Sequence, residues 1–219
     1  MKTNTIAFPF LGLCILLTSM VGSPTFADDV ETPTYTVLHA DKPFEIRYYD
    51  PMIIATTTVD AERIDAANIG FRRIAKYIFG ENSTETEIAM TAPVKQQPVV
   101  DDPDTERWTM SFVMPSQYSM DTLPRTTSPD IALTPIEPKQ FVVIRFSGSI
   151  SEKNLRKHKK KLIDYAQKKG VTIKGEAKYA FYNPPWTLPF FRRNEVMFEL
   201  AEDFSLSNET NESKNTDTL

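Results

Sequence analysis

Side chains capable of catalysis are sparse in this chain. Its two histidines, His39 and His158, lie far apart in the sequence, and His158 sits in a lysine- and arginine-rich run that disfavours its protonated form. The sequence contains no HExxH, P-loop, nucleophile-elbow or glycine-rich dinucleotide motif. Glu45 and Glu195 are candidate general bases, but each has an arginine two residues away, and we interpret both as ion-paired strand residues. We therefore predict that the protein is not an enzyme.

The most unusual stretch is residues 183–193, with the sequence NPPWTLPFFRR. Its three prolines exclude a regular helix and an interior strand. Three aromatic side chains make it more apolar than an ordinary exposed loop. Such a rigid loop suits a flat apolar ligand, whose carboxylates Arg192 and Arg193 could hold in bidentate fashion. A loop that only caps the core is the alternative, and the sequence favours neither reading.

The first half of the chain alternates strand and helix patterns. Strands are predicted at 44–49, 52–59, 87–94 and 107–114. The first two are expected to pair across an Asp50-Pro51 turn. Asp60 is the expected N-cap of a helix that runs to Phe79 and is followed by Gly80. The predicted buried stripe of this helix consists of Ile64, Ala67, Phe71, Ile74, Ala75 and Ile78.

The same order of elements recurs in the second half. Strands are predicted at 131–136, 141–146, 171–182 and 195–200, the first two paired around Glu137-Pro138. Ser151 is expected to cap a second helix that ends before Gly170. Two β-β-α-β-β units predict one α+β domain with a pseudo-twofold axis, and a cleft where sheet and helix meet.

Both ends of the 219-residue chain differ from its body. Residues 1–27 have the form of a cleavable signal peptide, with an apolar run followed by small residues at Thr25 and Ala27. Residues 28–33 indicate a linker, 34–203 the folded domain, and 204–219 a disordered polar tail. We expect an exported protein without a transmembrane segment after cleavage, periplasmic in a Gram-negative bacterium and secreted otherwise.

Charge and cysteine content limit the possible partners. The one cysteine lies in the predicted signal peptide, so the processed chain has no disulfide and no thiolate ligand. With 25 Lys and Arg against 29 Asp and Glu, the acidic chain is not expected to bind nucleic acid. The basic run at 156–161 on the second helix is either a solvated face or a surface that docks on an anionic membrane. We expect a monomer.

Four short stretches together resemble the SOUL haem-binding protein family. They are 44–49 (FEIRYY), 70–78, 90–94 (MTAPV) and 182–196, which begins YNPP and ends NEV. The resemblance covers residues 33–200. It implies a distorted antiparallel β-barrel of two similar β-β-α-β-β halves with two flanking helices, which agrees with the repeat. It also implies non-covalent binding of haem or another tetrapyrrole near the first helix and a late aromatic loop.

Candidate cofactor-binding residues follow from this resemblance: Tyr48, Phe71, Arg72, Arg73, Lys76, Trp186, Phe190 and Phe191. The aromatic members would pack against the macrocycle and the basic members would meet its propionates. Tyr48 stands where some family members carry a proposed axial histidine. Its phenolate is a candidate ligand of ferric iron, and an ordinary half-buried strand tyrosine is the alternative.

Covalent attachment of haem is excluded because the sequence has no CxxCH motif. Export together with the resemblance gives the expected role, which is capture, buffering or transport of haem outside the cytoplasm. Two alternatives stay open. One is a binding module for another apolar small molecule, and the other is a membrane or protein interaction module that acts through the basic second helix.

Overall fold

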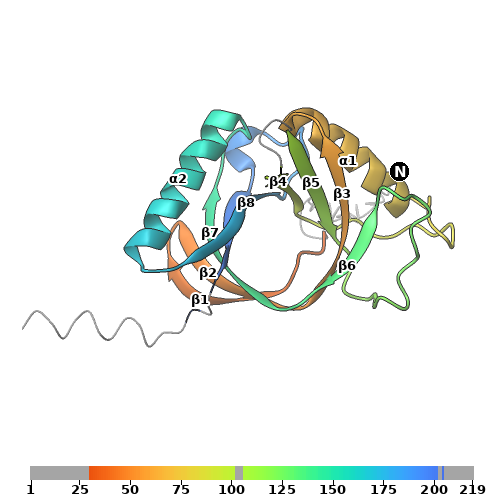
Figure 1. Ribbon diagram of the computed structural model, residues 1–219, viewed down its shortest axis with the longest axis horizontal. Helices are drawn as coiled ribbons and strands as arrows, with labels where there is room; N and C mark the ends of the chain where they lie inside the picture. The colour runs from red at the N-terminus through yellow and green to blue at the C-terminus, as the bar shows by residue number, and fades with distance from the viewer. Residues whose placement is uncertain (1–29, 102–105, 202–203, 205–219) are drawn as a thin grey trace, which may run out of the picture.

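The computed structural model describes residues 30–101, 106–201 and 204. Nine antiparallel strands form one curled sheet in the order β1-β2-β7-β9-β8-β4-β5-β3-β6 (Figure 1). The strands are β1 (Tyr35–Asp41), β2 (Phe44–Tyr49), β3 (Met52–Asp60), β4 (Val94–Val99), β5 (Arg107–Val113), β6 (Ala132–Ile136), β7 (Lys139–Phe146), β8 (Ile173–Phe181) and β9 (Asn194–Leu200). Helices α1 (Arg63–Ile78) and α2 (Glu152–Lys168) lie on its outer side (Figure 1). The predicted α+β distorted barrel is confirmed.

Strand pairing relates the two halves by a pseudo-twofold pattern. β3 and β4 both pair with β5, as β7 and β8 both pair with β9. Between the halves, β2 pairs with β7, β6 with β3, and β4 with β8. The predicted repeat is confirmed, with β1 added at one edge. The two predicted hairpins, 44–49 with 52–59 and 131–136 with 141–146, are wrong because β2 and β6 each hydrogen-bond to the opposite half.

Each helix covers one half of the outer surface of the sheet. α1 packs on β3 and β5 around Ile74 and Met110, and α2 packs on β7, β8 and β9 around Leu162 and Val196. A third apolar cluster, which includes Met197, lines the inner face of the sheet. Because side chains alternate along each strand, the same strands supply side chains to the clusters under the helices and to the cluster on the inner face.

The buried side of α1 is rotated from the predicted stripe. Ile64 and Phe71 are 64% and 40% exposed, whereas Arg63, Ala66, Gly70 and Tyr77 are buried. Gly70 explains the rotation, because a Cβ atom there would lie 2.4 Å from Cγ of Met110 on β5. The side of the helix that carries Gly70 therefore faces the sheet, and Ile64 and Phe71 are left partly in solvent.

Three elements near the start of the domain also differ from expectation. The predicted strand 87–94 is wrong, since β4 begins only at Val94, after Pro93, which has no N–H for a ladder. Asp60 ends β3, and Glu62 stands at the N-cap of α1. Strand β1 was not predicted.

The described ends of the chain are attached to the domain. The carbonyl of Glu31, in the predicted linker, accepts from the N–H of Ala92 at 2.9 Å. Phe204, in the predicted tail, packs against the α2 cluster. The predicted signal peptide and residues 205–219 lie outside the described residues. Among the residues that are described, no helix has the length and apolar character needed to cross a membrane.

Candidate functional site

The inner face of the sheet holds a buried charge cluster. Arg47 on β2 donates two hydrogen bonds to Glu195 on β9, at 2.9 and 3.1 Å. The Glu195 carboxylate also accepts from Arg193 at 2.8 and 3.0 Å and from the Tyr182 hydroxyl at 3.0 Å. Nε of Arg47 donates to the carboxylate of Glu45 at 2.6 Å. Both candidate bases are thus ion-paired with arginines, as predicted.

The electrostatics of this cluster favour the ionised form of Glu195. Burial alone would raise the pKa of Glu195, but hydrogen bonds and charge from Arg47 and Arg193 hold that pKa below its ordinary value. Burial raises the pKa of Tyr49 to about 12 and also raises that of Tyr182. An ionised, fully bonded carboxylate is a poor proton acceptor, so this cluster is structural.

The outer face of α1 presents an apolar flank. Phe71 packs its ring against Phe112 of β5, with centroids 5.6 Å apart, yet remains 40% exposed. Ile64, two turns earlier, lies on the same side of the helix. These two side chains are open to contact by a ligand.

The aromatic loop, which we define as residues 182–193, is rigidly braced. Nε of Arg192 donates to the Thr187 carbonyl at 2.7 Å, and Nη2 donates to the Pro185 carbonyl. The N–H of Thr187 bonds the Pro184 carbonyl at 3.0 Å, and residues 189–191 form a 3₁₀ turn. Both loop arginines are therefore engaged within the protein, Arg192 with backbone and Arg193 with Glu195, rather than offered to ligand carboxylates.

This bracing holds large apolar side chains in solvent. Trp186 is 81% exposed, Phe190 64%, Phe191 71% and Leu188 55%. The alternative that the loop only caps the core does not hold for these four side chains. Exposed apolar surface of this kind marks interaction sites on soluble proteins.

Contacts place the aromatic loop at the same end of the sheet as the apolar flank of α1. Phe112, which Phe71 touches, pairs with Val94, and Val94 pairs with Phe181 at the start of the loop. Phe112 and Phe181 are therefore two strand spacings apart, a backbone distance of about 10 Å. We call the exposed residues Ile64, Phe71, Trp186, Leu188, Phe190 and Phe191 the apolar surface.

A basic pocket lies on the other flank of α1. Its volume is about 510 Å³, and its lining includes Arg72, Arg73 and Lys76 together with the segment 127–131. Arg73 faces Asp130 at 3.6 Å and Lys76 faces Glu81 at 3.3 Å. Nε of Arg72 donates to the backbone carbonyl of Asn68 at 3.3 Å, and Arg72 has no acidic partner among the residues that the structure describes. Of the three basic residues that line the pocket, Arg72 is therefore the one whose charge is least neutralised by a neighbouring carboxylate.

Tyr48 is not brought together with the other candidate residues. It pairs with Gln140 on β7, six residues before Phe146, and Phe146 pairs with Asn194 at the end of the aromatic loop. Six residues of strand span roughly 20 Å. Tyr48 lies in the half of the sheet that α2 covers, whereas Phe71 lies on α1. A flat ligand against the apolar surface would not reach its hydroxyl.

Neither histidine joins the apolar surface. His158 on α2 stacks on Phe146 at 3.8 Å, and its Nδ1 is 2.8 Å from the Asn154 carbonyl. Burial, followed by the nearby Lys161 and Lys157, lowers its pKa. His39 lies on β1, where its ring is 6.0 Å from that of Phe204. Within the described ranges, no three His, Cys, Asp or Glu residues gather in a way that could hold a metal ion.

Sequence reasoning missed two parts of this region. Leu188 and Ile64 belong to the apolar surface, but a lone leucine in a loop and an isoleucine on a helix resemble core residues. Asp130 and Ser128 line the basic pocket through tertiary packing, for which the sequence holds no local signal.

Comparisons with known proteins agree on one family. A family model described as "SOUL heme-binding protein" matches residues 30–199. Heme-binding protein 2 of Homo sapiens is 30% identical over 178 residues, covering 78% of this chain and 86% of the relative. Heme-binding protein 1 of Xenopus laevis is 30% identical over 161 residues, covering 71% of this chain and 82% of the relative.

Solved structures share the fold at low identity. The C-terminal domain of EcmrR aligns with a TM-score of 0.56 at 10% identity, covering 77% of this chain and 99% of that domain. A protein described as a hydrolase from Listeria innocua aligns with a TM-score of 0.51 at 12% identity, covering 75% and 94%. These likenesses concern the fold alone.

Proposed function

The chain belongs to the SOUL haem-binding protein family, and from that premise we propose that it binds haem or a related tetrapyrrole reversibly and without a covalent bond. The observation that carries the proposal is the apolar surface, in which the aromatic loop holds Trp186, Phe190 and Phe191 in solvent at the same end of the sheet as the exposed Phe71. Fully burying one such side chain contributes about 1.5–3 kcal/mol, so several together supply useful affinity for a flat apolar ligand.

The fit of a tetrapyrrole also depends on its carboxylates. A bound haem supplies a flat macrocycle, two propionates and an iron centre. Arg72 follows Phe71 on the exposed side of α1 and lines the basic pocket, and a guanidinium can hold a carboxylate in bidentate fashion. Arg73 and Lys76 add positive charge but already have Asp130 and Glu81 as partners. We therefore assign the main propionate contact to Arg72.

In this binding mode the affinity comes from packing of the macrocycle on the apolar surface and from contacts of the propionates with basic residues. Tyr48 stays a sequence-based candidate for the iron ligand, but its distance along β7 from the aromatic loop favours binding without it. The same geometry supports a second candidate function, binding of apolar small molecules without a metal. Metal-free porphyrin should then bind the apolar surface about as well as haem does.

A haem titration tests the proposal. Haem added to the processed protein should give a saturable shift of the Soret band at micromolar protein, and metal-free porphyrin should compete. A linear, unsaturated change would exclude a defined site. Equal competition by unrelated aromatic compounds would favour the more general binding module.

We further propose that the protein is exported and captures, buffers or transports haem outside the cytoplasm as a monomer without catalytic activity. The support is residues 1–27, whose apolar run and small residues at the cleavage point are typical of a signal peptide. Intact mass of the protein from its own host should correspond to a chain that begins at Asp28. Recovery of the full-length chain from the cytoplasm would contradict the proposal.

A further inference from the structure

The aromatic loop holds four large apolar side chains in solvent. Trp186, Leu188, Phe190 and Phe191 each keep more than half of their surface in solvent, and they lie on a braced loop that does not fold them inward. Tryptophan and phenylalanine held in this way are typical of segments that enter the interfacial layer of a membrane.

The neighbouring helix α2 carries a strongly cationic outer face. Between Glu152 and Lys168 it has seven lysines and arginines against two acidic residues. Leu155, Leu162 and Ala166 are buried against the sheet, so Arg156 and Lys157 project into solvent. Each basic residue near an anionic membrane surface raises the affinity about fivefold.

The two features are joined at one end of the molecule. The N–H of Gly148 donates to the Pro189 carbonyl at 2.8 Å, and Ser151, three residues later, precedes the first turn of α2. The side-chain amide of Asn194 donates to the Gly148 carbonyl at 3.0 Å. Figure 1 shows the blue segment that leads into β9 beside the upper end of α2. The aromatic loop and the first turns of the cationic face are therefore contiguous.

We propose that this composite surface docks the protein on an anionic lipid membrane. The first turns of α2 attract the negative headgroups, and Trp186, Phe190 and Phe191 enter the interfacial layer. A lipid bilayer offers anionic charge directly above an apolar layer, which matches a cationic helix beside an apolar loop. The aromatic side chains are shared with the proposed haem surface, but the charge of α2 takes no part in the proposed haem contacts, so the two proposals can be tested separately.

Trp186 provides a direct spectroscopic test. The chain has two tryptophans, and Trp108 is partly buried, packed near Tyr179. The haem-free processed protein is mixed with phosphatidylcholine vesicles that contain or lack phosphatidylglycerol. With phosphatidylglycerol, Trp186 emission should move to shorter wavelength and should be quenched by bromine-labelled acyl chains. Trp186→Phe gives the background from Trp108, and Trp108→Phe reports Trp186 alone.

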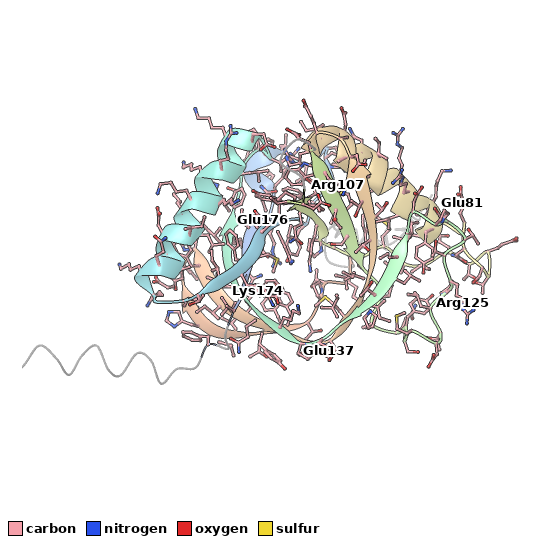
Figure 2. All side chains as sticks on the ribbon, viewed as in Figure 1. Glu81, Arg107, Arg125, Glu137, Lys174 and Glu176 are labelled. Carbon is pink, nitrogen blue, oxygen red and sulfur yellow. The ribbon has the colours of Figure 1, made fainter. Side chains whose placement is uncertain are left out.

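Matched charge variants test the role of α2. Arg156→Gln with Lys157→Gln removes two exposed cations and should lower the partition coefficient on anionic vesicles roughly 30-fold. Arg125→Gln with Lys174→Gln removes the same charge from positions away from the upper end of α2 (Figure 2) and should leave the partition coefficient within about twofold. Raising the salt concentration should weaken binding of the wild type and of the control alike.

Four outcomes would overturn the proposal. Three of them are equal binding to vesicles with and without phosphatidylglycerol, equal loss in the two charge variants, and binding in which Trp186 emission is unchanged. The fourth is the absence of vesicle binding, which is the result expected if the partner is an acidic protein. A normal haem titration of the Arg156→Gln, Lys157→Gln variant separates failure of this inference from failure of haem binding.

Discussion

Arg47 and Glu195 lie 148 residues apart in the sequence and meet through two hydrogen bonds inside the sheet. They are the centres of two of the short stretches by which the family is recognised, FEIRYY and NEV. Their side chains are 1% and 0% exposed. These stretches therefore specify a buried ion pair that joins the two halves of the sheet, whereas the ligand surface that we propose lies elsewhere.

Glu195→Gln should destabilise the fold by about 3–5 kcal/mol, because it leaves two arginines without their shared carboxylate. The free energy of unfolding in urea measures the loss. Asp164→Asn, which removes the exposed partner of Lys160, is the control and should change stability by less than about 0.5 kcal/mol. A loss below about 1 kcal/mol for Glu195→Gln would contradict the assigned role.

Acid should act through the same carboxylate. The pKa of Glu195 is held below its ordinary value in the folded protein, so its stabilising contribution is present above that ordinary value. The contribution is lost as pH falls through the folded-state pKa. Glu195→Gln should therefore have a flatter acid limb in a plot of unfolding free energy against pH.

Lys95→Met should remove a pH dependence at alkaline pH. Burial, followed by the charge of Lys178, lowers the pKa of Lys95 from 10.5 to about 8. Between these values the unfolded chain binds more protons, so the stability of the wild type should rise with pH. Below about pH 8 both states carry the proton, and the charged amine is a net cost that methionine removes.

Unfolding free energies between pH 7 and pH 10.5 check this expectation. Lys42→Met, at an exposed position, is the control and should keep the slope of the wild type. The same slope in Lys95→Met as in the wild type would show that Lys95 is not the group responsible.

Gly70→Ala should destabilise the protein despite the better helix propensity of alanine. The added Cβ would lie 2.4 Å from Cγ and 3.0 Å from Cβ of Met110. Overpacking of this kind costs about 1–3 kcal/mol, more than the roughly 1 kcal/mol gained from propensity. Thermal unfolding measures the effect, and Met110→Ala in the same chain should relieve the contact. A stabilised Gly70→Ala protein would contradict the close approach of α1 to β5.

Tyr48→Phe should leave the ferric haem spectrum and the haem affinity unchanged. Tyr48 is about 20 Å along β7 from the aromatic loop. Absorption spectra of the two haem-loaded proteins make the comparison, with Arg72→Gln as the contrasting variant that should weaken affinity. Loss of a phenolate signature in Tyr48→Phe would instead identify Tyr48 as the iron ligand.

The local patterns of apolar residues predicted the helices and strands better than they predicted which strands pair. β2, β9 and both helices were predicted to within a few residues because apolar alternation and helical spacing are properties of single segments. The predicted hairpins failed because β2 and β6 each bond to a strand of the other half. No local pattern distinguishes a hairpin partner from such a crossover.

The candidate site was predicted in part for the same reason. The aromatic loop and the exposed arginine on α1 were identified from composition and resemblance. The exposure of Phe71 was not, because Gly70 rotates α1 and a glycine contributes nothing to an apolar stripe. The pairing of Glu195 with Arg193 could be predicted because the two residues are two positions apart in the sequence. Its pairing with Arg47 could not, because Arg47 lies near the other end of the domain sequence.

The most direct measurement compares haem titrations of the wild type and of Phe190→Ala with Phe191→Ala. The Soret-detected dissociation constant should rise about 10- to 100-fold in the double variant, because two exposed rings of the apolar surface are lost. Met120→Ala, a 44% exposed apolar residue outside that surface, should titrate as the wild type does. An unchanged dissociation constant in the double variant would contradict a haem site on the apolar surface.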